Sequence, residues 1–187
     1  LAVLAAASLA GADLALSALA LADLKPAGGR GTRKPLALPG GEALLIDESY
    51  NANPLSMRAA LALLGQAEIS GRGRRIAVLG DMLELGARSK ALHAELAEPV
   101  VENEVDLVFC AGPHMRALWD ALPSERRGGY AEGAKALEPQ LLDAVRRGDA
   151  IMVKGSNGSK MALIVKALER LSARHIDDAG TDEKVQG

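Results

Sequence analysis

The chain has 187 residues, of which 49 % are hydrophobic and 25 % are charged, a balance typical of a globular protein with one domain or slightly more. Its net charge of −2, without a basic run interleaved with aromatic residues, argues against nucleic acid as a partner. The single cysteine, Cys110, lies in an apolar run and has no internal disulfide partner, so a cytoplasmic location is expected.

Residues 1 to 24 are rich in alanine and leucine and predict a helical hairpin. Gly11 is suited to end the first helix and Asp13 to cap the second, because a carboxylate accepts hydrogen bonds from free backbone N–H groups. No positive charge precedes the apolar run, and Asp13 and Asp23 interrupt it, so we expect neither a signal peptide nor membrane insertion. Two such helices need a surface to pack on, which predicts that the chain is the C-terminal part of a longer protein.

Residues 25 to 35, KPAGGRGTRKP, are dense in glycine, proline and positive charge, and they predict an interdomain linker. We therefore expect residues 1 to 34 to be a helical end and linker of one domain, and residues 35 to 174 to form the next. Arg30 is the candidate functional residue of the linker, although a solvated linker charge would explain it equally well.

From Pro35 onward, short apolar runs alternate with helical segments, which predicts an α/β, doubly wound, Rossmann-like domain. Its mostly parallel sheet is expected to be flanked by helices on both faces, with a Pro99 that ends or kinks the second helix. The tail from 175 to 187 has little to bury and predicts disorder. The strands are expected at 43 to 47, 75 to 80, 106 to 112 and 150 to 155, with a weaker one at GGY near Tyr130, and the helices are expected to bury Met57, Leu61, Leu64, Leu92, Leu96, Val100, Met161, Ile164, Leu168 and Leu171.

Such a sheet binds ligands beyond the carboxyl ends of its strands, and these positions are rich in polar side chains here. Pro54 is suited to begin the helix after the first of them, where its missing N–H costs little. The residues that follow the strands are Asp47, Glu48, Ser49, Tyr50, Asn51 and Asn53, then Asp81 and Glu84, and finally Lys154 and Ser156.

Some signatures are missing from the sequence. No G-x-G-x-x-G follows a strand and opens a helix, no G-x-x-x-x-G-K-[ST] is present, and the three histidines are far apart and lack cysteine partners. If the chain takes part in catalysis, the main phosphate-binding apparatus must lie elsewhere.

The segments LIDESYNANPLSM, VLGDMLELGARSKALH and VKGSNGSKM, in this order and at these separations, resemble the C-terminal domain of Mur ligases. Within that family they resemble the member that adds the terminal dipeptide to the peptidoglycan precursor. The resemblance covers roughly residues 1 to 172. It implies an N-terminal domain and a central ATPase domain upstream, where the main sites for ATP and Mg²⁺ would lie.

The resemblance also implies the reaction and its partners. ATP phosphorylates the terminal carboxylate of UDP-MurNAc-tripeptide, the amine of D-Ala-D-Ala attacks the acyl phosphate, and the intermediate collapses to the amide. The C-terminal domain would close over the central one and act by orientation and charge stabilisation. The 187-residue chain alone is therefore expected to have no ligase activity.

The resemblance assigns roles to residues of the linker and the first strand end. Arg30 would reach the ATP phosphates. Either Asp47 or Glu48 would face the ATP ribose or the hinge. Tyr50, Asn51 and Asn53 would line the dipeptide or nucleotide cleft, the alternative being amides that only cap the loop and the helix.

Roles follow for the other strand ends as well. Asp81 and Glu84 would hold the incoming ammonium group or pair with a basic neighbour. His93 would contact substrate or merely form a hydrogen bond within its helix. Lys154 and Ser156, beside an anion nest at Gly155 and Gly158, would bind a carboxylate or phosphate.

Two other functions fit the same sequence. The chain could be a free-standing, non-catalytic ligand-binding module on this fold, because fold alone does not imply function. It could also belong to a sister Mur ligase with another amino-acid substrate, although SYNANP disfavours that reading.

Overall fold

The computed structural model describes residues 2–22 and 28–182, with the backbone alone for residue 22 and residues 177–182. It confirms the predicted α/β class. The helices of the described chain are α1 (Ala2–Leu9), α2 (Leu14–Ala22), α3 (Pro54–Gly65), α4 (Ser89–Ala94), α5 (Ala97–Glu102), α6 (Arg116–Ala121), α7 (Ala134–Ala144) and α8 (Ala162–Asp182). The strands are β1 (Thr32–Leu38), β2 (Gly41–Glu48), β3 (Arg75–Gly80), β4 (Leu107–Ala111), β5 (Arg127–Ala131) and β6 (Ala150–Lys154).

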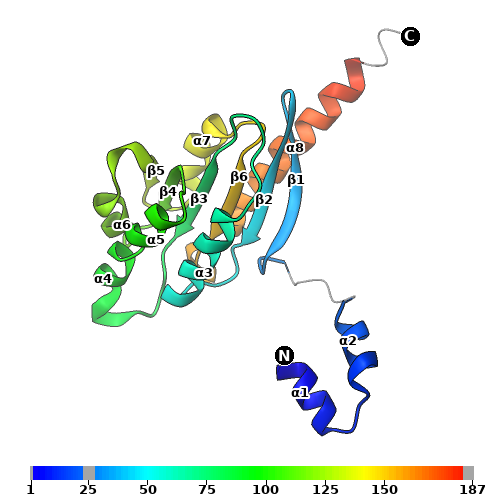
Figure 1. Cartoon of the computed structure of the whole chain (residues 1–187). Coiled ribbons are helices and arrows are strands. Elements are labelled where there is room, and N and C mark those ends of the chain that lie inside the picture. The colour runs from blue at the N-terminus through cyan, green and yellow to red at the C-terminus, as the bar shows by residue number, and fades with distance from the viewer. Residues whose placement is uncertain (1, 23–27, 183–187) are drawn as a thin grey trace.

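The predicted helical hairpin is confirmed in α1 and α2 (Figure 1). Gly11 turns the chain with a φ of +84°, and Asp13 caps α2 by accepting a hydrogen bond from the Leu16 N–H at 2.9 Å. Leu9, Leu14, Leu16 and Leu19 are each more than half exposed, so the hairpin has no core of its own. Among the described helices, none is both long and apolar enough to cross a bilayer.

The six strands form one sheet in the order β1-β2-β6-β3-β4-β5. All neighbours are parallel except β1, which runs antiparallel to β2. The chain returns to place β6 between β2 and β3, so the carboxyl ends of these three strands lie side by side. The fold class expected from the alternation of strands and helices is thus confirmed, including the weak strand around Tyr130.

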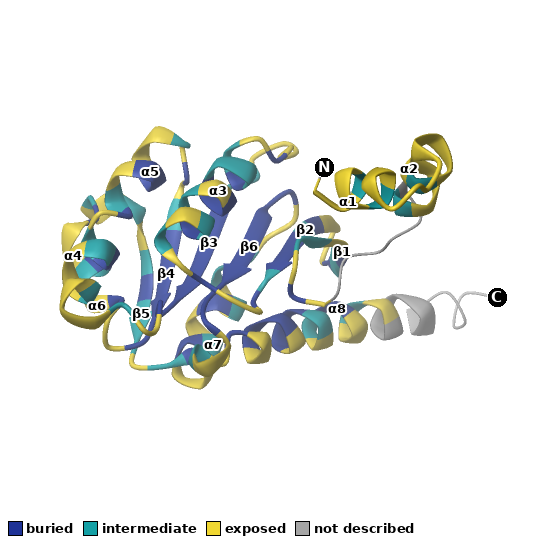
Figure 2. Ribbon diagram, turned by 90° about the horizontal axis from the view of Figure 1, so that it is seen from below, coloured by how far each residue is buried: buried dark blue, intermediate teal, exposed yellow. Residues whose placement is uncertain are grey.

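Each face of the sheet carries its own hydrophobic core. Helices α3 to α6 cover one face and α7 and α8 the other (Figure 1), and the strands between them are buried (Figure 2). Met57 and Leu61 of α3 pack on the first face, while Ile164 and Leu168 of α8 pack on the second, all fully buried as predicted. Cys110 is also buried, and burial raises the pKa of its thiol.

Strand β1 differs from the prediction, because residues 32 to 35 were expected in the linker and belong to the sheet instead. Leu36 and Leu38 bury one face of the strand, whereas Arg33, Lys34 and Pro35 stay exposed. Lysine and proline are common on edge strands, where they discourage pairing with other chains, and this makes the strand resemble a linker. The domain boundary after residue 34 stays a prediction.

The C-terminal end also differs from the prediction. Helix α8 continues to Asp182, although disorder was expected from residue 175 onward. Extending an existing helix adds a hydrogen bond for each residue fixed, which favours continuation of the backbone helix once it is formed. Residues 183 to 187 of the expected tail lie outside the described residues.

The second predicted helix is two short helices, α4 and α5, and Pro99 does not end either of them. Pro99 lies in the first turn of α5, where backbone N–H groups have no partner within the helix, so its missing N–H costs nothing there. The break lies at Glu95 and Leu96, and because the Pro99 ring excludes the carbonyl of residue i−4, Glu95, the kink expected from Pro99 is confirmed.

The amino ends of the strands are joined by a buried ion pair. The Asp149 side chain has no exposed surface and lies 2.8 Å from Nη2 of Arg74. Its oxygens also accept the backbone N–H groups of Arg74 and Arg146, each at 2.9 Å. One carboxylate therefore connects the loop before β3 with the loop before β6.

Candidate functional site

The carboxyl ends of β2 and β6 bring Glu48 and Lys154 opposite each other. The Lys154 side chain is only 3 % exposed, and its Nζ donates to the Asn51 carbonyl at 2.9 Å and to Oε2 of Glu48 at 3.4 Å. A buried ammonium group needs such partners, because an isolated charge in the interior is costly. Lys154 thus fixes both the end of β2 and the loop that follows.

Arg30 and Tyr50 form the outer part of this site. The Arg30 guanidinium carbon lies 4.3 Å from the centre of the Tyr50 ring, a cation–π contact, and the ring itself is half exposed. The Tyr50 N–H donates to the Gly29 carbonyl at 3.2 Å. A pocket of about 190 Å³ lies here, lined by Gly29, Arg30, Glu48, Tyr50, Asn51, Asn53, Ser56 and Lys154.

Asp47 and Glu48 take different positions, although the sequence leaves the choice between them open. Asp47 is buried, and its Oδ1 accepts hydrogen bonds from the Ser49 hydroxyl at 2.6 Å and the Ser49 N–H at 3.1 Å. Glu48 is partly exposed and lines the pocket. Of the two carboxylates, Glu48 is the one that lines this pocket, while Asp47 shapes the turn.

Asn51 and Asn53 shape the loop before α3. Asn53 is the N-cap of the helix, where its Oδ1 accepts the Ser56 N–H at 2.9 Å and the Ser56 hydroxyl accepts the Asn53 N–H at 3.0 Å. The Asn51 side chain accepts from Ala52 N–H at 2.8 Å. The capping alternative is therefore observed for Asn53, and both residues also line the pocket.

We expect Asn53→Ala to lower the free energy of unfolding by about 1 kcal/mol, because the alanine leaves the first turn of α3 without its acceptor. Asn53→Asp keeps an acceptor at the same place and should retain the stability. Denaturant unfolding of the 187-residue chain measures both. Equal stability of the alanine variant and the parent would contradict the capping role.

A second pocket of about 430 Å³ adjoins the first along the strand ends, and Asn51 and Asn53 line both. Glu84 lines it from the loop after β3, is exposed, and adopts a φ of +63°, a conformation uncommon outside glycine. Gly158 lies on its other side. Glu84 is placed where a carboxylate would meet a cationic group of a ligand.

Ser156 connects three loops at this pocket. Its hydroxyl accepts the Leu83 N–H at 3.0 Å and donates to the Ala52 carbonyl at 3.3 Å, and its N–H donates to the Asp81 carbonyl at 3.0 Å. Ser156 is 6 % exposed, so its hydroxyl holds the loops together. Of the two glycines expected to form an anion nest, Gly155 is buried and Gly158 is exposed.

Asp81 lies at the end of β3, beside a third pocket of about 490 Å³. Its carboxylate is buried, accepts the Met115 N–H at 2.8 Å, and packs so closely on Gly112 that a Cβ there would lie 2.4 Å from it. The same pocket carries Lys135 and Lys160 at its surface. The sequence analysis did not predict either lysine or Gly112 as a site residue. Gly112 could have been found, because it is a glycine that directly follows strand β4.

His93 is fully buried and lies behind the strand ends. Its Nε2 accepts the Met82 N–H at 3.0 Å, so Nδ1 carries the proton and donates to the Ser89 carbonyl at 2.7 Å. Burial lowers the pKa of His93, an effect opposed by the hydrogen bond to Ser89 and the charge of Asp81. Both ring nitrogens are thus occupied within the protein, and the imidazole holds the loop after β3.

This burial makes the stability of the fold depend on pH. The folded chain binds the His93 proton less readily than the unfolded chain, whose pKa is about 6.5, so protonation favours unfolding. The contribution of neutral His93 is present above that pH and is lost as the pH falls below it. We expect the melting temperature to fall more, between about pH 7.5 and 5.5, in the parent than in His93→Gln, which cannot titrate. Equal falls in the two proteins would contradict this account.

Within residues 2–22 and 28–182, no group of three or more His, Cys, Asp or Glu side chains is arranged to hold a metal ion. We call the pocket-lining groups at the carboxyl ends of β2, β3 and β6 the strand-end site. It offers the cations of Arg30 and Lys154, the carboxylate of Glu48 and the amides of Asn51 and Asn53 on rigid elements. Such a set binds and orients polar, charged ligands.

A family model described as Mur ligase, glutamate ligase domain, matches residues 37–157. This match covers strands β2 to β6. It also covers the loops after β2 and β3 and the beginning of the loop after β6, which form the strand-end site. The chain belongs to the Mur ligase family.

The relatives point to one member of that family. The UDP-N-acetylmuramoyl-tripeptide–D-alanyl-D-alanine ligase of Escherichia coli is 37 % identical over 161 residues, which is 85 % of this chain and 33 % of the relative. The enzyme of the same name from Rickettsia prowazekii is 32 % identical over 155 residues, 83 % of this chain and 33 % of the relative. The chain thus spans about a third of the length of these relatives.

Solved structures agree with this placement. The MurF ligase from Thermotoga maritima in complex with ADP matches with a TM-score of 0.72 and 25 % identity, over 91 % of this chain and 37 % of that one. MurF from Acinetobacter baumannii matches with a TM-score of 0.74 and 27 % identity, over 88 % of this chain and 35 % of that one. The resemblance noted in the sequence is confirmed by family, by relatives and by fold.

Proposed function

We propose that this chain works as the C-terminal part of an ATP-dependent ligase that joins D-Ala-D-Ala to UDP-MurNAc-tripeptide. The observation that carries the proposal is the strand-end site itself, where Arg30, Glu48, Tyr50 and Lys154 line one pocket. Relatives named for this reaction support it. The upstream two thirds of such a ligase would supply the main sites for ATP and Mg²⁺, and the cytoplasm, where ATP is available, would be its location.

The proposed roles follow from position and charge. Arg30 is exposed and would bind a phosphate oxygen of ATP, since guanidinium and phosphate groups match in geometry. Glu48 would accept hydrogen bonds from a ribose hydroxyl or an ammonium group. Tyr50 would present its ring to the ligand, because nearly half of its surface is free.

The remaining predicted residues divide into two groups. Glu84 would meet the ammonium group of the dipeptide from the second pocket. Asn51 would bind the dipeptide or nucleotide beside it. Asp81, His93 and Ser156 are buried and would act by holding the loops in place, so their effect on substrate would be indirect.

The test uses a complete protein in which this chain follows the upstream domains found in its relatives. We expect ADP release only when ATP, Mg²⁺, UDP-MurNAc-tripeptide and D-Ala-D-Ala are all present. The 187-residue chain alone should release no ADP under the same conditions, because it has no G-x-x-x-x-G-K-[ST] sequence.

The competing functions give different results in this assay. Turnover with a single amino acid such as D-glutamate, and none with the dipeptide, would identify a sister ligase and overturn the proposed substrate. No turnover with any amine, together with saturable ligand binding by the 187-residue chain, would favour the free-standing binding module.

A further inference from the structure

The amino ends of the parallel strands, opposite the strand-end site, carry a second group of charged side chains, most of them positive. Three segments meet there: the β1–β2 turn with the first two residues of β2 (39–42), residues 70–72 before β3, and residues 145–148 before β6. They enclose a hollow of about 910 Å³, which we call the basic hollow. The β1–β2 turn lies at the upper end of the sheet in Figure 1.

The lining of the basic hollow is strongly biased in charge. Arg72, Arg146 and Arg147 line it, against the single carboxylate of Glu42. In the part of the chain that the structure describes, the side chains of Arg72 and Arg146 have no ion-pair or hydrogen-bond partner. Since the whole chain has a net charge of −2, this gathering of cations does not follow from composition.

The frame that holds these arginines is rigid. Arg147 donates from Nη1 to the Gly40 carbonyl at 2.9 Å, and the Gly148 N–H donates to the Glu42 carbonyl at 2.7 Å. Gly148 has a φ of +85°, and a Cβ there would lie 2.3 Å from the Ser70 carbonyl oxygen. The backbone of Arg146 is fixed by buried Asp149. The Arg147 side chain and the backbone of Arg146 are thus fixed before a ligand arrives, which lowers the entropy that binding costs at these two positions.

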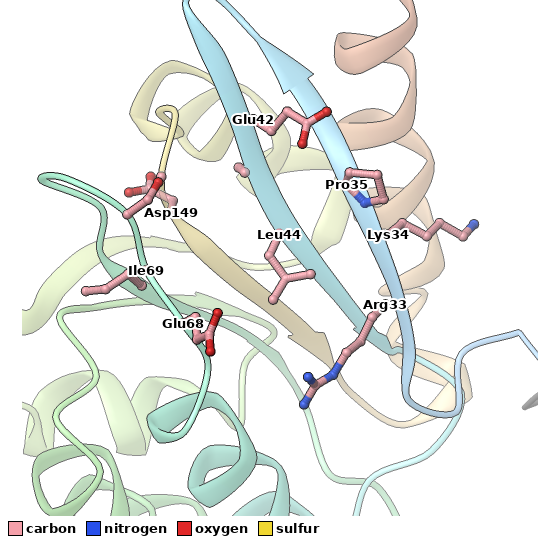
Figure 3. Close-up of a pocket in the computed structure, with 11 residues that line it drawn as sticks. Arg33, Lys34, Pro35, Glu42, Leu44, Glu68, Ile69 and Asp149 are labelled. Atoms are coloured by element: carbon pink, nitrogen blue, oxygen red, sulfur yellow. The ribbon is translucent and has the colours of Figure 1, made fainter.

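The neighbouring pocket shows that this bias is local. It holds about 500 Å³ over Leu44, with Arg33 and Glu68 on either side of it (Figure 3). Besides Arg33 and Lys34, it is lined by Glu42, Glu68 and Asp149, so its charges nearly cancel. Lys34 points away from it and pairs with Glu169 of α8. Only the basic hollow offers an excess of positive charge in this region.

We propose that the basic hollow binds a small multivalent phosphate. Arginine pairs with phosphate through two parallel hydrogen bonds, and several arginines select for more than one phosphate group. The volume falls within the usual range for small-molecule sites, and no aromatic side chain lines it to stack on a base. The phosphate chain is therefore the part that is recognised. This site is independent of the proposed ligase function, because it lies at the opposite edge of the sheet.

Inorganic tripolyphosphate is the probe, added to the 187-residue chain while backbone amide shifts are followed by NMR. We expect saturable shifts at Gly71 and Gly148, and a dissociation constant raised about tenfold by either Arg72→Gln or Arg146→Gln. Both side chains are exposed, so the melting temperatures should stay unchanged. The matched control is Arg170→Gln, which removes the same charge from α8 and should leave the affinity unaltered.

Several results would overturn the proposal. Shifts confined to Tyr50 and Asn51 would place the anion at the strand-end site, and equal losses in the Arg72 and Arg170 variants would show attraction by overall charge. Binding of a hexa-aspartate peptide at Gly71 and Gly148, without binding of tripolyphosphate, would assign the hollow to an acidic protein segment. If one arginine variant is unstable, the other carries the test.

Discussion

The Asp149→Ala variant is expected to lose about 3 kcal/mol of unfolding free energy, with a fall of roughly 10 °C in melting temperature. This carboxylate has no exposed surface and holds the Arg74 side chain as well as the backbone N–H groups of Arg74 and Arg146. Its removal leaves the Arg74 side chain, which is only 22 % exposed, without its counter-charge. Breaking one side of a buried pair costs far more than an exposed pair contributes.

Two comparisons make this prediction specific. Asp143→Ala removes an exposed carboxylate from α7 and should change the stability little. Adding Arg74→Met to the Asp149→Ala variant should restore part of the loss, because the unpaired cation is then gone. Thermal melts of the four proteins measure these effects. A loss in Asp149→Ala no greater than that in Asp143→Ala would contradict the account.

A Lys154→Met variant of the complete ligase is expected to lose at least about a hundredfold in kcat/KM, with no comparable loss of stability. Loss of contacts worth about 2.8 kcal/mol in the transition state accounts for such a factor. Nζ of Lys154 holds both Glu48 and the Asn51 carbonyl, so its removal releases two sides of the ligand pocket together. Methionine fills a similar volume, and the Glu48 side chain, which is 24 % exposed, can be solvated once its partner is gone, so we expect a smaller loss of stability than in Asp149→Ala.

The control for this variant is Lys166→Met, which changes an exposed lysine of α8 and should leave the kinetics unaltered. Steady-state kinetics with ATP and the dipeptide varied separately, beside thermal melts, distinguish the outcomes. A Lys154→Met protein that melts much earlier but keeps its kcat/KM would show that Lys154 acts only in folding.

The sequence predicts most of the fold because the buried strands and the helix faces are strongly patterned. β3, β4 and β6 are continuous apolar runs, and the helices repeat apolar residues at helical spacing, so their types follow directly. Strand β1 escapes this pattern, since only Leu36 and Leu38 are buried in it. The two-residue turn Pro39-Gly40 between it and β2, followed by Gly41 at the start of β2, was the available hairpin signal.

The sequence predicts where the candidate site lies better than it predicts which side chains face the pocket. The rule that ligands bind beyond the carboxyl ends of parallel strands brings Glu48, Tyr50 and Lys154 together correctly. This rule does not distinguish a carboxylate that lines the pocket, such as Glu48, from one that shapes its own turn, such as Asp47. That distinction depends on the Ser49 hydrogen bonds, which arise from the local backbone path.

His93 shows a similar limit. Its motif is visible in the sequence, but whether an imidazole faces the ligand or the interior depends on the packing of α4 behind the loop after β3. The basic hollow was not predicted either, because its arginines come from loops about 70 residues apart in the chain.

The segment that leads into the domain is fastened to the strand-end site at two points. The Gly31 N–H donates to the Asp47 carbonyl at 2.9 Å, and the Gly29 carbonyl accepts from the Tyr50 N–H. Arg30 lies between these two bonds, with its guanidinium over the Tyr50 ring. Arg30 is therefore held against the domain by backbone hydrogen bonds on both sides and keeps its place relative to Glu48 and Tyr50. In the ligase that we propose, the cation of Arg30 would thus meet a ligand together with Glu48 and Tyr50, as one preformed set of groups.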